Sequence, residues 1–148
     1  MNWDDKWKKV KKGFYVYAFE KLEVWQLARV FKTRIYRMTD TFPDHEKYGY
    51  SSQLRRAAMS ISVNLAEGSG RASSNDKAHF TNMSYTSALE VIDHLIGVYD
   101  LNYISEEAYV SLRQDLDHII NKLNALYKYQ INQKSGLKSH LKNDSLEE

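Results

Sequence analysis

Apolar residues recur every three or four positions through four long stretches of this chain, a spacing that marks one face of an α-helix. The spacing predicts helices over residues 22–40, from about 43 to 67, 73–101 and 105–133. A single proline, Pro43, occurs in 148 residues, too few breaks for an all-β chain. The intervening loops are too short for crossover connections, so we expect an all-α protein, an antiparallel up-down four-helix bundle.

Three of the four predicted helices carry one apolar stripe each, which would face a shared core. Their members are Leu22, Trp25, Ala28, Phe31, Ile35, Met38 and Phe42; Leu54, Ala57, Ala58, Ile61 and Leu65; and Tyr109, Leu112, Leu116, Ile119, Leu123, Leu126 and Tyr127. Boundary residues agree with this division. Phe42 precedes Pro43 and is thereby disfavoured in helix, Ser73 and Ser105 are N-cap candidates, and Gly68 is expected as a left-handed C-cap.

The helix predicted over residues 73–101 is apolar on two adjoining faces. One face holds Phe80, Met83, Ser87, Val91, Leu95 and Val98, and the other holds Tyr85, Ala88, Leu89, Ile92, Ile96 and Tyr99. A helix that is apolar over so much of its circumference is buried on two sides. One bundle of this size does not need both faces, so we expect a stable homo-oligomer.

The two ends of the chain differ from the bundle, which we place at residues 19–133. Residues 1–18 form a basic aromatic leader, in which Gly13 and the β-prone residues 14–17 argue against a stable helix. We expect this arm to dock on its own or a neighbouring subunit. Residues 134–148 are polar and are expected to form a flexible tail.

Composition excludes several classes of protein. The chain has no cysteine, which removes disulfides, thiol nucleophiles and Cys-ligated metals. No run approaches 18 apolar residues, and the first 20 residues have no apolar segment typical of a secretory signal. We therefore expect a cytoplasmic protein with no membrane partner.

Charge is distributed unevenly along the chain. Residues 1–72 hold 14 Lys and Arg against 8 Asp and Glu, a net charge of +6, whereas residues 73–148 carry −4. Such a distribution favours either a basic face for a polyanion or a head-to-tail contact between subunits.

Catalytic and metal-binding patterns are weak. Di-iron bundles need repeated Glu-x-x-His pairs, but Asp115-x-x-His118 and Glu90-x-x-x-His94 each occur once, so no metal or other cofactor is expected. Arg113 followed by His118 resembles the Arg-x4-6-His motif of HEPN ribonucleases. Five helical residues turn through about 140°, however, so the two side chains share a face poorly. The chain is therefore not expected to be an enzyme.

Five cations are the candidates for contact with phosphate: Arg29, Lys32, Arg55, Arg56 and Arg71. Arginine can grip a phosphate through a bidentate fork, which positions nucleic acid without reading its sequence. A salt-bridge network between subunits is an equally natural use of these side chains.

The stretch from Ser52 to Gly68, followed by Arg71, resembles the hallmark Gln-Leu-Arg-Arg-Ala-x-x-Ser-Ile-x-x-Asn-Ile-Ala-Glu-Gly of the bacterial four-helix bundle proteins. These are also called the intervening-sequence proteins of large-subunit ribosomal RNA genes. The resemblance covers about residues 19–130 and leaves the leader and the tail without a counterpart.

The resemblance implies a ring-like homopentamer without established enzymatic activity. A similar protein is the accessory factor of diversity-generating retroelements, a basic pentameric bundle that binds nucleic acid and a reverse transcriptase. Matched polar positions are expected to form a structural or intersubunit network: Gln53, Asn64, Glu67, Gly68 and Glu90. We therefore expect a non-catalytic, RNA- or DNA-binding accessory oligomer. The alternatives are a protein-interaction scaffold and, less favoured, a HEPN-like ribonuclease.

Overall fold

The computed structural model describes residues 3–10 and 12–144, with side chains over 5–10 and 12–133. All regular elements in this part of the chain are helical, which confirms the all-α prediction. They are α1 (Trp3–Val10), the 3-10 helix η1 (Ala18–Lys21), α2 (Glu23–Thr39), the 3-10 helix η2 (Asp44–Glu46), α3 (Tyr50–Ser69), α4 (Ser74–Asp100) and α5 (Glu106–Asp144).

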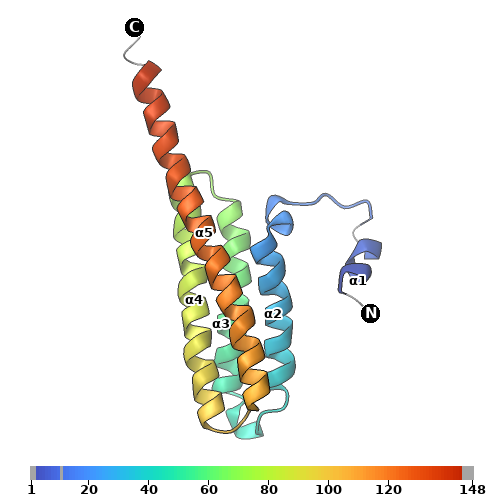
Figure 1. Ribbon diagram of the computed structural model, residues 1–148. Coiled ribbons are helices and arrows are strands. Elements are labelled where there is room, and N and C mark those ends of the chain that lie inside the picture. Colours follow the sequence, from blue (N-terminus) through green and yellow to red (C-terminus); the bar gives the residue numbers. More distant parts are fainter. Residues whose placement is uncertain (1–2, 11, 145–148) are drawn as a thin grey trace.

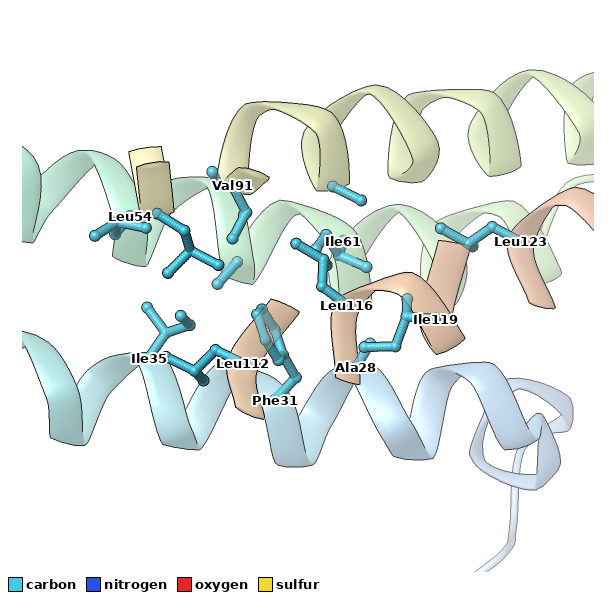
Figure 2. Close-up of a cluster of buried hydrophobic side chains, with 14 of the residues drawn as sticks. Ala28, Phe31, Ile35, Leu54, Ile61, Val91, Leu112, Leu116, Ile119 and Leu123 are labelled. Atoms are coloured by element: carbon cyan, nitrogen blue, oxygen red, sulfur yellow. The ribbon is translucent and has the colours of Figure 1, made fainter. Parts of the chain in front are cut away.

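The four long helices, α2 to α5, lie side by side around one hydrophobic core, and α1 stands apart from them (Figure 1). Figure 2 shows the centre of this core, where Phe31 and Ile35 of α2 face Leu54 and Ile61 of α3. Leu116 of α5 closes the same layer and is fully buried. Burial of apolar surface of this kind is the main force that holds the helices together.

The predicted stripes become the core with small shifts. At the start of α2 the core is entered by Val24, and not by Trp25 as the stripe had predicted. Trp25 lies at the edge of the core and is partly exposed. On α3 every predicted stripe residue is buried. On α5 the stripe is buried from Leu112 to Leu123, and Tyr127 is exposed.

The helix boundaries bear out most of the capping predictions. The Ser73 hydroxyl accepts the backbone N–H of Asp76 at 3.1 Å, and the Ser105 hydroxyl accepts that of Ala108 at 3.1 Å. α4 ends at Asp100, within one residue of the prediction, but the left-handed residue that follows it was not predicted. Asn102 adopts a φ of 59°, and the N–H of Tyr103 reaches back to the carbonyl of Val98 at 2.9 Å, which closes the last turn.

The predicted role of Gly68 was wrong. Gly68 is buried inside α3, which continues to Ser69, and Gly70 follows as the C-cap with a right-handed φ of −86°. A Cβ on Gly68 would lie 2.7 Å from the Cβ of Phe80 on α4. Glycine is needed here because α3 and α4 approach each other closely, and not because the chain turns into the left-handed region.

Three further boundaries differ from the prediction. α3 begins at Tyr50, after the 3-10 helix η2, and not between Pro43 and Tyr48. A helix does form in the leader, α1, and its Trp7 ring lies 5.7 Å from the guanidinium carbon of Arg29 on α2. α5 continues to Asp144 instead of ending near residue 133. No proline follows residue 133, and a lone Gly136 costs a helix only about 1 kcal/mol. Flexibility of the tail stays a prediction, and residues 145–148 lie outside the described residues.

None of the helices in the described ranges combines the length and the apolar character that crossing a bilayer requires.

Candidate nucleic-acid interface

The two adjacent arginines of α3 point to opposite neighbours. Arg55 reaches α2, and Arg56 reaches α4, because consecutive residues on a helix are about 100° apart. The five predicted cations therefore do not form one patch. They are divided between the seam that joins α2 to α3 and the seam that joins α3 to α4.

Arg55 is bound at three points to the end of α2. Its Nε donates to Thr39 Oγ1 and its Nη2 donates to Asp40 Oδ1, both at 2.7 Å. Its guanidinium carbon lies 4.9 Å from the centre of the Tyr36 ring. Thr39 is buried and Arg55 is half-buried, so these bonds fix the direction of the guanidinium group.

Two more cations continue this line along the same seam. Lys32 Nζ donates to Ser62 Oγ at 3.4 Å, and one turn further along α2 the Tyr36 hydroxyl donates to Met59 Sδ at 3.0 Å. Arg29 lies between two indole rings, 5.4 Å from the Trp25 ring and 5.7 Å from the Trp7 ring of α1. We call this line of alternating cations and aromatic rings the α2–α3 seam; its members are Trp25, Arg29, Lys32, Tyr36 and Arg55.

Arg56 belongs to a different group of side chains. It donates to Gln53 Oε1 from Nε and Nη2, at 3.2 and 3.1 Å, and its Nη2 also contacts the carboxylate of Glu90 on α4. Glu90 Oε1 lies 3.7 Å from Nε2 of His94. Arg56 thus joins two members of the predicted network, Gln53 and Glu90.

The other members of the predicted network lie apart. Asn64 is buried, and its amide donates to the Ser60 carbonyl at 2.8 Å and to Ser60 Oγ at 3.0 Å. Ser60 Oγ in turn lies 2.8 Å from Ser87 Oγ on α4. The α3–α4 seam is thus lined by small polar side chains and the buried Gly68. Glu67 is exposed, and its carboxylate has no hydrogen-bond or ion-pair partner in the described part of the chain.

Arg71 follows α3, and its side chain contacts two residues in the first turns of α4. Its Nη2 lies 3.6 Å from Asp76 Oδ2, and its guanidinium carbon lies 5.3 Å from the Phe80 ring. Both partners belong to α4, so Arg71 lies near the α3–α4 turn and away from the α2–α3 seam.

Arg113, the arginine of the HEPN-like pair with His118, is bonded to two other residues of its own helix. Arg113 Nε donates to Asp117 Oδ1 at 3.2 Å and its Nη1 donates to the Tyr109 hydroxyl at 2.9 Å. Burial opposes its charge, but the bonds to Asp117 and Tyr109 prevail and raise the pKa of Arg113 above its ordinary value. His118 is exposed. Among the described residues, no group of three or more His, Asp or Glu side chains has an arrangement that would hold a metal.

The sequence analysis missed the aromatic half of the α2–α3 seam. Trp25, Arg29, Lys32 and Tyr36 follow the three-four spacing of one helix face, beside the buried face of Ala28, Phe31 and Ile35. That mixed stripe was visible in the sequence, but the search for apolar periodicity assigned Trp25 to the core.

Two large apolar residues of α4 stay exposed: Leu89 is 43% and Ile96 is 42% exposed. They belong to the second of the two faces predicted for this helix. The rest of that face is covered by the chain itself, since Ala88 is buried, Tyr85 and Ile92 pack against the core and Tyr99 stacks on Tyr109 of α5 at 5.1 Å. The uncovered part of α4 is therefore limited to Leu89 and Ile96 and their surroundings.

The fold and its surfaces define a class: all-helical proteins with four long helices around one core and a cation-rich seam on the surface. Within that class the chain belongs to the 23S rRNA-intervening sequence protein family, whose model matches residues 20–125. α1 and the segment that follows it precede the matched region.

A solved structure has a similar fold. It is a protein of unknown function from the S23 ribosomal protein family of Bacteroides thetaiotaomicron, with a TM-score of 0.67 and 24% sequence identity. The match covers 71% of this chain and 98% of that one. A search of curated proteins finds no match.

Proposed function

We propose that the protein is a non-catalytic, cytoplasmic homo-oligomer of up-down four-helix bundles, with five subunits, that binds nucleic acid and RNA in particular. The observation that carries the proposal is the α2–α3 seam. Arg29, Lys32 and Arg55 follow one another along it, each beside an aromatic ring or a hydroxyl group. The description of the family refers to an intervening sequence of 23S ribosomal RNA. This association favours RNA over DNA as the ligand.

Position on the molecule decides which cations take part. Arg56 and Arg71 lie outside the α2–α3 seam and each pairs with a carboxylate of α4, so we assign them to holding α3 against α4. Lys32 has no carboxylate partner among the described residues, and its ammonium group is within reach of solvent. Arg55 shares its charge with Asp40, which is itself mostly exposed, so a phosphate can compete for the guanidinium group.

Two exposed apolar residues of α4 support the proposed assembly of subunits. Leu89 and Ile96 stay exposed in a single subunit, and a neighbouring subunit would remove both from water. Repetition around a ring multiplies a modest basic seam into a multivalent surface. Light scattering at micromolar concentration tests the assembly: we expect about five times the 17.3 kDa of one chain, and the mass of a single chain would contradict it.

Binding is tested by salt titration with a single-stranded RNA and a DNA of the same length. Affinity should fall steeply as salt rises, with a slope of about −0.7 in log–log form for each phosphate neutralised on a single strand. The double variant Lys32→Ala/Arg55→Ala should weaken binding to all sequences and lower the slope. The matched control is Arg34→Ala/Arg56→Ala, which removes the same charge from outside the seam, where Arg34 contacts Asp115 of α5.

The same assays separate the proposal from its rivals. Equal loss of binding in both double variants would show that net charge, and not the seam, attracts the polymer. No binding even at 50 mM salt, together with an intact oligomer, would favour a protein-interaction scaffold, for which the exposed α4 face is the supporting observation. Cleavage of RNA that disappears in His118→Ala would replace the proposal with a ribonuclease.

A further inference from the structure

The segment between α1 and η1 exposes three aromatic rings within four residues. Phe14, Tyr15 and Tyr17 are 68%, 78% and 61% exposed. The segment lies away from the core of the four long helices (Figure 1). Isolated exposed aromatics need no explanation, but a contiguous group of this size marks a binding surface.

Two of these rings, Tyr15 and Tyr17, form one end of a continuous aromatic series. The Tyr15 and Tyr17 ring centres are 5.0 Å apart, those of Tyr17 and Phe19 are 6.5 Å apart with planes within 18°, and Phe19 meets Trp25 edge-on at 5.0 Å. Trp25 is the first member of the α2–α3 seam. The series therefore leads from the leader directly onto the cations of that seam.

The leader and the rings also enclose a hollow. A space of about 480 Å³ is lined by Trp7, Phe14, Tyr15, Tyr17 and Phe19, among others. Its volume lies within the range of about 300–1,000 Å³ that small-molecule pockets occupy. Five of its eight lining residues are aromatic, and the others are Val10, Val16 and Glu20.

Lysines flank this aromatic surface, which also carries two acidic groups: Glu20 lines the hollow, and Asp5 lies 3.9 Å from Lys8. Lys8, Lys9 and Lys12 precede it and Lys21 follows it, and all four are exposed. Rings that stack on bases, combined with cations that follow a phosphate backbone, are the two components of sequence-tolerant single-strand binding. A duplex hides its base faces and cannot use the rings in this way.

We propose that residues 5–10 and 12–21 form a stacking platform for single-stranded nucleic acid, with Phe14, Tyr15 and Tyr17 contacting bases and the flanking lysines contacting phosphates. The inference rests on the proposed function and adds the kind of nucleic acid that is bound and the element that selects it. Phe14, Tyr15 and Tyr17 all precede the region that the family model matches, residues 20–125.

The test compares two variants of the full-length protein. Phe14→Leu/Tyr15→Leu/Tyr17→Leu keeps apolar bulk but removes the ring faces, whereas Tyr15→Phe/Tyr17→Phe keeps the rings. The probes are a 12-nucleotide poly(U) RNA, a 12-nucleotide poly(A) RNA and a 12-base-pair RNA duplex. The leucine variant should bind both single strands at least about tenfold more weakly, with the salt slope unchanged because neutral rings release no counterions. The phenylalanine variant should bind like the parent, and duplex affinity should change little.

The outcomes are distinguishable. If the parent binds none of the probes, the proposed function fails together with this inference. If the parent binds RNA and the leucine variant binds it equally well, the platform is overturned while the proposed function stands. If the leucine variant loses oligomer mass, the rings contact a second copy of the chain and the platform is likewise overturned.

Discussion

α3 meets α2 along one side and α4 along the other, and the two seams are built differently. The α2–α3 seam holds long cationic and aromatic side chains such as Lys32 and Tyr36 near the surface. The α3–α4 seam holds small polar side chains and a glycine without room for a methyl group, and its arginines Arg56 and Arg71 are paired with carboxylates of α4. The close approach of α3 and α4 removes the space that a ligand would need, whereas the α2–α3 seam keeps Lys32 and Arg55 partly exposed.

Residue type alone does not decide which partners a side chain contacts. Arg55 and Arg56 are neighbours in sequence, yet one stacks on Tyr36 and the other bridges to Glu90. If the α3–α4 seam is the structural one, substitutions there should change stability and assembly. Substitutions in the α2–α3 seam should change binding.

The largest expected effect is that of Gly68→Ala. A Cβ at this position would lie 2.7 Å from the Phe80 Cβ, so the two helices must separate, at a cost of about 1–3 kcal/mol in unfolding free energy. Gly70→Ala is the matched control, because its added Cβ meets nothing closer than 3.5 Å. The control should be neutral or stabilising by up to about 1 kcal/mol. Urea denaturation measures the unfolding free energy of both variants. Equal stability of the two would contradict the close approach of α3 and α4 at Gly68.

Asn64→Ala should cost about 1 kcal/mol, since it removes two hydrogen bonds to Ser60 from a buried position. Asn82→Ala on the exposed surface of α4 is the control and should stay within about 0.5 kcal/mol of the parent. Thermal and urea unfolding provide the measurement. A loss as small as that of the control would show that the Ser60–Ser87 contact alone fixes this part of the seam.

Arg56→Ala should lower the unfolding free energy by less than about 1 kcal/mol, because the guanidinium group is half-exposed and solvent screens its contact with Glu90. The difference should shrink further in 1 M salt. Denaturation at low and high salt measures it. A loss of several kcal/mol that salt does not change would place the Arg56–Glu90 pair in the interior of an assembly.

Glu67→Ala should change the unfolding free energy of a single subunit by less than about 0.5 kcal/mol, since its exposed carboxylate has no partner in the described part of the chain. We expect it to lower the mass in light scattering, and with it the stability that assembly adds, because a network role for Glu67 requires a neighbouring subunit. An unchanged mass would remove Glu67 from the network and leave Gln53 and Glu90 as its members.

The sequence named five candidate cations but did not show how they are grouped, and their role in binding stays a prediction. It did not divide Arg55 from Arg56, because their partners Asp40 and Glu90 lie on different helices. The aromatic series was missed because it joins Tyr17, Phe19 and Trp25 across three elements. Such contacts depend on how chain segments pack, which periodicity does not contain.

By itself the sequence determined the four long helices, most of their buried stripes and the serine caps, because spacing and capping act within a few residues of the chain. Only the tertiary structure decided the role of Gly68, the two directions of the paired arginines and the contact of Trp7 with Arg29. Each of these depends on a residue from another helix. Their geometry is set by the crossing of packed helices, a property that no single stretch of the chain encodes.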